Sequence, residues 1–149
     1  MSQESLLPAP ASEQPPGLQR LKTRPQFQAV LAGKTLARTA HFALHSGPVG
    51  TDLFAGHCLW LGAMVPKRWA RRAVTRNTIK RQIYHVSQLY ASRLEHAAHL
   101  VRLRSAFDPK HFVSATSQAL KVAVRAELHK LFISACAATA AVNNGPVGH

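Results

Sequence analysis

The chain has 149 residues, of which 46% are hydrophobic, and it carries a formal net charge of +13 with a pI near 11.2. This length fits a single domain with tails and a modest core, and the charge favours a nucleic-acid partner. The sequence shows no apolar span of membrane-helix length and no signal peptide, so we expect a cytoplasmic protein without a membrane role. Cys58 and Cys136 lack the spacing of a metal site, and we expect both to be reduced.

The two ends of the chain differ in composition from its middle. Residues 1–17 are rich in proline among Ser, Gln and Ala, which predicts a disordered tail. Residues 134–149 begin Ala-rich and continue into Asn, Gly and Pro, which predicts a flexible tail. The folded domain is therefore expected over residues 18–133.

The first predicted element is a short helix. Thr23 can cap its start, a proline lies in its first turn, and Gly33 ends it. A strand is predicted at 42–44, where Phe and Leu alternate with Ala. An apolar run at 58–65 predicts a buried central strand. Pro66 ends this strand because proline has no backbone N–H for the sheet.

A long helix is predicted from about residue 72 to 94. Its apolar residues form one stripe at helical spacing, namely Ile79, Ile83, Val86, Tyr90 and Leu94. Polar and cationic residues occupy the other side, namely Asn77, Lys80, Arg81, Tyr84 and Gln88. The helix is therefore expected to pack one face on a sheet and to turn a cationic face outward.

A further strand is predicted at 100–103 and a last helix from 114 or 116 to 132, with leucines and a valine facing inward. The order helix, strands, helix, strand, helix predicts an α/β (α+β) sandwich with one layer of sheet. The two strands around the long helix would form a parallel pair if they are neighbours.

The densest charge lies in the run 67–81, which contains seven Lys or Arg residues and no acid. Repulsion among these cations destabilises the fold unless a polyanion neutralises them, so we predict that the run binds nucleic-acid phosphates. A solvated helix face is the alternative interpretation, and for Asn77 the alternative is a local surface hydrogen bond. The predicted binding residues are Lys67, Arg68, Arg71, Arg72, Arg76, Asn77, Lys80 and Arg81.

Catalytic and metal-binding patterns are weak. The chain has six Asp and Glu residues in total, none of them paired, which leaves no carboxylate cluster to hold two metal ions. His96 and His99 have helical spacing but no recognisable third ligand, so we predict no zinc site. We therefore predict no catalytic residue and no cofactor bound by protein side chains alone.

Three consecutive segments resemble the RNR signature of the bacterial ribonuclease P protein subunit: Val65-Pro66-Lys67-Arg68, Arg71-Arg72-Ala73 and Arg76-Asn77-Thr78-Ile79-Lys80-Arg81. The resemblance covers about residues 20–132. The opening Arg20-Leu21-Lys22 with Phe27 and Val30 is similar to the family's first segment, and residues 42–44 and 61–65 are similar to two of its strands.

The resemblance implies about four strands in a mixed sheet with three helices and a left-handed crossover, the ribosomal protein S5 domain 2-like fold. In this family the catalyst is an RNA, which with bound Mg²⁺ removes the 5′ leader from precursor tRNA. The protein binds that catalytic RNA, with 1:1 stoichiometry expected, and the leader; no protein partner is evident. Mg²⁺ would be held mainly by the RNA. Charge alone leaves open a general RNA-binding or ribosome-associated protein without a role in cleavage.

The family's leader cleft lies between the first helix and the sheet face. Carried over to this chain, it implies a leader-contact set of Arg20, Lys22, Phe27, Leu31, Phe42 and Met64. From the residues alone, Phe27 and Phe42 fit a plain core equally well. Trp69 could likewise stack on a nucleotide or pack beneath the basic loop.

The chain departs from the family pattern at several positions. Tyr84 and His85 replace an Arg and an acid or amide, which weakens the prediction of a cationic face beyond Arg81. Leu31 replaces an aromatic of the cleft, and His45 stands at another aromatic position, so fewer side chains are available for base stacking.

Overall fold

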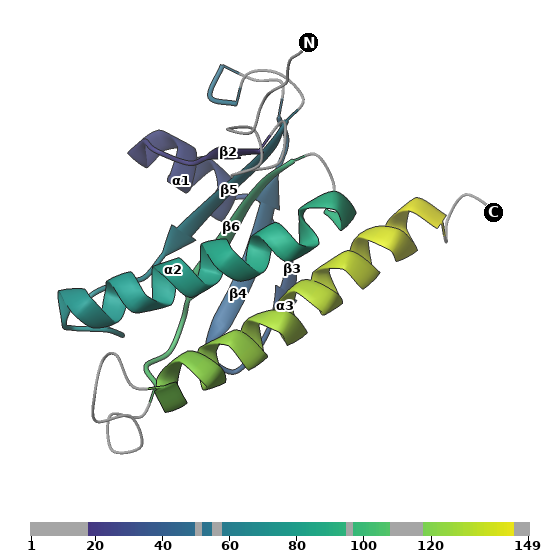
Figure 1. Ribbon diagram of the computed structural model, residues 1–149. Coiled ribbons are helices and arrows are strands. Elements are labelled where there is room, and N and C mark those ends of the chain that lie inside the picture. The colour runs from purple at the N-terminus through teal and green to yellow at the C-terminus, as the bar shows by residue number, and fades with distance from the viewer. Residues whose placement is uncertain (1–17, 50–51, 55–57, 95–96, 108–117, 145–149) are drawn as a thin grey trace, which may run out of the picture.

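Five strands form one mixed sheet in the computed structural model, which describes residues 18–49, 52–54, 58–94, 97–107 and 118–144 (Figure 1). In chain order the elements are β2 (Leu18–Arg20), α1 (Arg24–Leu31), β3 (Lys34–Arg38), β4 (Phe42–Gly47), β5 (Leu59–Met64), α2 (Ala73–Tyr90), the 3-10 turn η2 (Ala91–Arg93), β6 (Ala98–Leu103) and α3 (Gln118–Asn144). Across the sheet the strand order is β2-β5-β6-β4-β3. Strands β2, β5 and β6 are parallel, and β4 is antiparallel to both β6 and β3.

Helices cover both faces of this sheet. α2 and α3 lie side by side on one face, which we call the two-helix face, and α1 packs on the other, the α1 face (Figure 1). The alternation of strand residues divides the core accordingly. Phe42, Leu44 and Val101 are buried on the two-helix face, whereas Leu100 is buried on the α1 face together with Val30 from α1.

β5 and β6, the strands on either side of α2, are neighbours in the sheet, and they are parallel, as predicted for that case. In Figure 1 α2 lies in front of the sheet, and β6 lies to the left of β5 when the two strands are turned to point upward. The crossover is therefore left-handed, as the family resemblance implies, against the usual right-handed preference.

Thr23 caps α1 as predicted. Its Oγ1 accepts a hydrogen bond from the Gln26 backbone N–H at 3.3 Å, and Gln26 Oε1 accepts from the backbone N–H groups of Thr23 at 3.1 Å and Lys22 at 2.7 Å. These reciprocal bonds form a capping box. Gln26 Nε2 also donates to the Leu53 carbonyl at 2.9 Å, so one side chain fixes the start of α1 against the loop before β5.

The apolar stripe of α2 is buried as predicted. Ile79 is 1% exposed, and Ile83 and Val86 are fully buried against the sheet and α3. Because this stripe uses one side of the helix, the opposite side is left to solvent. The helix and the following 3-10 turn end at Arg93, next to the predicted end at residue 94.

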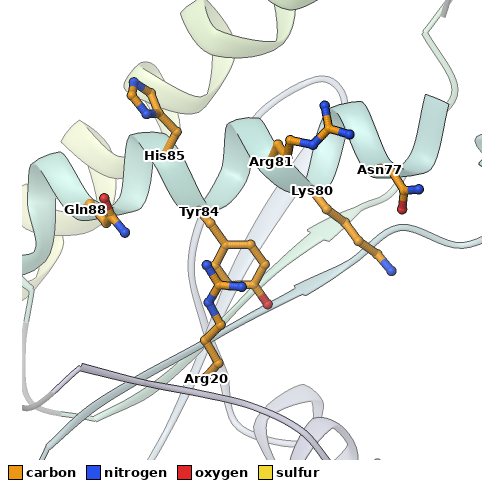
Figure 2. Close-up of a pocket in the computed structure, with 7 residues that line it drawn as sticks. All are labelled: Arg20, Asn77, Lys80, Arg81, Tyr84, His85 and Gln88. Carbon is orange, nitrogen blue, oxygen red and sulfur yellow. The ribbon is translucent and has the colours of Figure 1, made fainter. Parts of the chain in front are cut away.

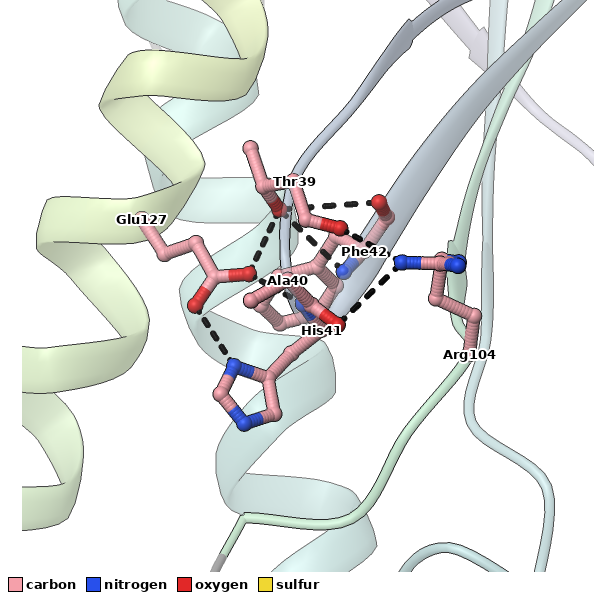
Figure 3. A network of polar contacts seen from close by, with 6 residues as sticks. All are labelled: Thr39, Ala40, His41, Phe42, Arg104 and Glu127. Carbon is pink, nitrogen blue, oxygen red and sulfur yellow. Dashed lines mark hydrogen bonds and ion pairs between the residues drawn. The ribbon is translucent and has the colours of Figure 1, made fainter.

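A polar network anchors α3 to the turn between β3 and β4 (Figure 3). The Glu127 carboxylate accepts from Thr39 Oγ1 and from the His41 backbone N–H, both at 2.5 Å, and lies 2.8 Å from His41 Nδ1. Arg104 donates to the carbonyls of Thr39 at 2.8 Å and Ala40 at 3.2 Å. The turn is therefore held from α3 on one side and from the end of β6 on the other.

The structure adds two strands that the sequence did not predict, β2 and β3. β2 has only three residues, and a register shift between Thr35 and Ala37 interrupts the alternation of β3. α3 also continues to Asn144, so the predicted domain end at residue 133 is too early. Ala135 is fully buried in the core, and alanine is the strongest helix former. The predicted tail at 1–17 and the predicted helix start at 114 or 116 lie outside the described residues.

Candidate RNA interface

The eight predicted binding residues gather on the loop after β5 and on the outward side of α2. Seven of the eight are exposed, and we call them the basic face: Lys67, Arg68, Arg71, Arg72, Asn77, Lys80 and Arg81. The spacing on the helix explains the grouping, because residues three or four positions apart share one side. No Asp or Glu occurs between residues 53 and 94, so no acid from this stretch offsets the charge.

The start of α2 adds to this positive potential. Its N-cap residue, Arg72, makes no side-chain hydrogen bond to the first turn, and that turn contains no acid. Backbone N–H groups at a helix start carry partial positive charge and are suited to bind anions such as phosphate. The exposed side chains and the helix end therefore favour the same class of ligand.

Arg76 differs from the other predicted binding residues because the fold already uses part of its guanidinium. Its Nη1 donates to the carbonyls of Ala70 at 3.1 Å and Arg71 at 2.7 Å. The side chain is half-buried and closes the basic loop onto the first turn of α2. Arg76 thus holds the loop in place, in addition to any contact with a ligand.

Trp69 packs beneath the basic loop, which is one of the two placements that the sequence allowed. Its ring is partly buried against the core of the two-helix face. The Arg68 guanidinium lies over the indole at 5.3 Å from the ring centroid. The indole is therefore a support for the loop and for Arg68, within the range of a cation–π contact.

Arg20 lies beside α2, away from the other predicted leader residues. Its guanidinium stacks over the Tyr84 ring, with Cζ 3.9 Å from the ring centroid. The two side chains, from β2 and α2, line a pocket of about 410 Å³ together with residues of the outward side of α2 (Figure 2). Burial raises the pKa of Tyr84 above its usual value, while Arg20 acts in the opposite direction.

Three of the predicted leader residues lie together on the α1 face. Phe27 and Leu31 of α1 and Met64 of β5 are partly buried and pack around the core of that face. Their remaining exposed surface leaves them accessible to a ligand. Lys22 is exposed just before α1, on the chain that leads into this helix.

Phe42 does not belong to this group, and its assignment to the leader cleft is wrong. The ring is fully buried on the two-helix face, where it packs near Phe107 with ring centroids 5.9 Å apart. The alternation of β4 explains the error. The alternation shows that positions 42 and 44 share a face, but it does not show which face, since helices cover both.

Two arginines lie in one cross-strand row on the α1 face near the end of β5. They were not predicted as site residues from the sequence. The sheet register places Arg38 opposite Ala43, Ala43 opposite Arg102, and Arg102 opposite Met64. Directly paired residues lie on the same face, so the two arginines stand on either side of a small alanine. A polar residue within the apolar strand 100–103 is the sequence signal that could have identified Arg102.

His45 stands in the next row and contacts Arg102. Arg102 Nε donates to His45 Nε2 at 3.2 Å, and His45 Nδ1 lies 3.2 Å from Thr35 Oγ1. Because arginine has only donors, Nε2 must be unprotonated, and the neutral ring carries its proton on Nδ1. Burial and then the Arg102 and Arg38 charges lower the pKa of His45, which keeps the ring neutral near neutral pH.

Among the described residues, no three His, Cys, Asp or Glu side chains lie close enough together to hold a metal ion, and His96 lies outside those residues. In the same part of the chain, no helix is long and apolar enough to cross a membrane.

Comparisons with known proteins agree with the fold. The family model described as Ribonuclease P matches residues 16–131. The ribonuclease P protein component of Bordetella parapertussis is 36% identical over 117 residues, which cover 78% of this chain and 91% of the relative. That of Burkholderia mallei (strain SAVP1) is 32% identical over 116 residues, which cover 78% and 81%.

A solved structure of the RNase P protein from Staphylococcus aureus aligns with a TM-score of 0.57 at 20% sequence identity. The alignment covers 75% of this chain and 90% of that protein, which shows a shared fold. The match of the family model over most of the chain and the relatives above 30% identity show the family directly. The chain therefore belongs to the Ribonuclease P family.

Proposed function

We propose that this chain is the protein subunit of ribonuclease P and binds, one to one, the catalytic RNA that removes the 5′ leader from precursor tRNA. The observation that carries the proposal is the exposed, acid-free basic face on α2 and its preceding loop in a member of this family. Family membership favours this function over the general RNA-binding role that the charge alone leaves open.

The basic face has the chemistry that an RNA backbone requires. Arginine guanidinium groups bind phosphate through two parallel hydrogen bonds, and lysine adds a mobile point charge. The uncapped start of α2 contributes backbone N–H donors at the same end of the surface. Binding through such contacts releases counterions from the RNA, so the affinity should fall steeply as salt is added.

The α1 face supports a second contact, with the single-stranded leader. Phe27, Leu31 and Met64 offer apolar surface for unstacked bases, and Arg38 and Arg102 stand beside them on the sheet. Base stacking on aromatic side chains contributes about 1–3 kcal/mol per base and tolerates any sequence. With one aromatic side chain in this group, we expect weak discrimination among leader sequences.

The bond-breaking chemistry is proposed to belong to the RNA, with Mg²⁺ held mainly by its phosphates. Asp52 and Glu127 are the carboxylates among the described residues, and Glu127 is engaged by Thr39 and His41. The protein would offset repulsion between the catalytic RNA and its substrate, and so lower the Mg²⁺ that the RNA needs. A cytoplasmic location stays a prediction from the sequence.

A salt titration tests the basic face. We expect the double variant Lys80→Ala, Arg81→Ala to bind the full-length catalytic RNA more weakly than wild type. Each lost phosphate contact reduces the slope of log affinity against log salt by about 1, so the variant should lose about 2. Affinity would be measured by filter binding at four or more salt concentrations.

The control for this titration removes the same charge elsewhere. Arg93→Ala with Lys130→Ala changes two exposed cations outside the basic face, on η2 and α3. This control should keep the wild-type slope. Equal slopes for wild type and for the Lys80 and Arg81 variant would show that the outward side of α2 does not contact the RNA.

A further inference from the structure

The pocket between β2 and α2 has a composition that phosphate pairing alone does not explain. α2 contributes six residues at positions i, i+3, i+4, i+7, i+8 and i+11, namely Asn77, Lys80, Arg81, Tyr84, His85 and Gln88, and β2 contributes Arg20 (Figure 2). Its volume of about 410 Å³ lies within the range of small-ligand pockets, roughly 300–1,000 Å³. It combines cations, amides and a stacked arginine–tyrosine pair, and no acid lines it.

The Arg20 guanidinium is held as a flat plate. It lies 3.9 Å from the centroid of the Tyr84 ring, and Tyr84 is itself partly buried against the core of the two-helix face. Tyr84 therefore supports one face of the guanidinium. The Arg20 side chain is exposed, so its other face is available to a second planar group. Guanidinium planes stack on nucleic-acid bases as aromatic rings do.

The other residues of the pocket can bind the base edge, the ribose and the phosphate of a nucleotide. Asn77 and Gln88 carry side-chain amides, each with donors and an acceptor for a base edge or a ribose hydroxyl. Lys80 and Arg81 stand between them along the helix and supply charge for a phosphate. The planar guanidinium, the side-chain amides and the cations are therefore suited to the base face, the base edge or ribose, and the phosphate of one nucleotide.

We propose that this pocket binds a single unpaired nucleotide of the catalytic RNA, with its base stacked on Arg20, its edge facing Asn77 or Gln88, and its phosphate at Lys80 and Arg81. The proposal rests on the proposed function and adds a stacking contact to a surface otherwise described by charge. A paired nucleotide would not fit this role, because its base faces are already covered by its neighbours in the helix.

Arg20→Lys is the decisive variant because it keeps the positive charge and removes the planar guanidinium. A stacking contribution of 1–3 kcal/mol per base corresponds to about 5- to 150-fold in affinity, and lysine retains part of the attraction. We expect Arg20→Lys to bind the full-length catalytic RNA about 5- to 20-fold more weakly, with the salt slope unchanged. Tyr84→Leu, which removes the support, should act in the same direction, whereas Tyr84→Phe should bind like wild type.

The matched control is Arg93→Lys, the same substitution in the neighbouring arginine–tyrosine pair. Arg93 lies 4.7 Å from the Tyr90 ring centroid and does not line the pocket. It should leave the affinity unchanged. Base-specific chemical probing of the RNA gives a second readout: wild-type protein should protect one unpaired base that stays reactive with Arg20→Lys. Thermal melts of each variant confirm that it is folded.

Two results would overturn the proposal while leaving the proposed function intact. In the first, Arg20→Lys binds within twofold of wild type and protects the same bases. In the second, the affinity loss comes with a shallower salt slope, which indicates phosphate pairing without stacking. If wild-type protein neither binds the catalytic RNA nor stimulates its cleavage of precursor tRNA, the proposed function fails and this inference fails with it.

Discussion

His45 is the residue that holds Arg102 of the α1 face in a defined orientation. Arg102 and Arg38 lie in one cross-strand row without a carboxylate opposite them in the register. The acceptor that the fold supplies for Arg102 is a neutral imidazole nitrogen, at 3.2 Å. A neutral acceptor orients the guanidinium and leaves its charge available to an anionic ligand.

This arrangement predicts a stability loss on acidification. The pKa of His45 is lowered in the folded protein, so below about pH 6.5 the unfolded chain binds more protons than the folded one. The contribution of the neutral ring to stability is complete above about pH 6.5 and is lost as the pH falls through the folded pKa. The melting temperature should therefore drop between pH 7.5 and 5.5.

His45→Gln separates this effect from the other histidines. Glutamine can accept from Arg102 and donate to Thr35, but it does not titrate. The melting temperature of the variant should fall less between pH 7.5 and 5.5 than that of the wild type. Identical losses in the two proteins would show that the protonation of His45 does not affect folding.

Single residues also show which features could be predicted from the sequence and which could not. The Thr23 cap was predictable because its partner, Gln26, lies three residues away. The placement of Arg20 was not, since it depends on β2 joining the edge of the sheet beside β5, about forty residues later in the chain. The replacement at Tyr84 weakened the prediction of a cationic face beyond Arg81, yet Arg20 brings a guanidinium to that point from another element.

At the scale of the elements, Glu127 is the polar anchor that joins α3 to the turn between β3 and β4. Glu127 is 14% exposed and receives its hydrogen bonds from the turn between β3 and β4. Removing it leaves the Thr39 hydroxyl and the His41 backbone N–H without this acceptor. Hydrogen bonds to charged groups contribute about 1.5–3 kcal/mol, so Glu127→Ala should lower the free energy of unfolding by about that amount in urea titrations.

Glu127→Gln is the comparison for this anchor, because it keeps the length and one acceptor while removing the charge. It should lose less stability than the alanine variant. A loss below about 0.5 kcal/mol for Glu127→Ala, the usual range for surface changes, would contradict the role given to the network.

Helices were the most predictable elements because their signals are local and repeated. The apolar stripe of α2 predicted both the helix and its buried side. The residues left for the other side are mostly cationic or polar, which predicted the exposed cationic face. Strand faces were harder, as Phe42 shows, since helices pack on both sides of the sheet and alternation alone does not distinguish them. The end of α3 was missed because an Ala-rich segment was interpreted as a tail.

At the scale of the whole molecule, the fold separates two surfaces that serve one proposed purpose. The basic face lies on α2 and the loop before it, on the two-helix side of the sheet. The partly exposed residues Phe27, Leu31 and Met64 lie on the α1 face. A protein with a net charge of +13 can thus contact two polyanions from different sides and reduce the repulsion between them. The left-handed crossover sets which side α2 occupies relative to α1.

The measurement that tests this account most directly is cleavage of a 5′-extended precursor tRNA by the cognate catalytic RNA at low Mg²⁺, with and without the protein. We predict little cleavage by the RNA alone and efficient cleavage at the mature 5′ end once the protein is added. Protein that binds the RNA but leaves the rate and site of cleavage unchanged at every Mg²⁺ concentration would contradict the proposed function.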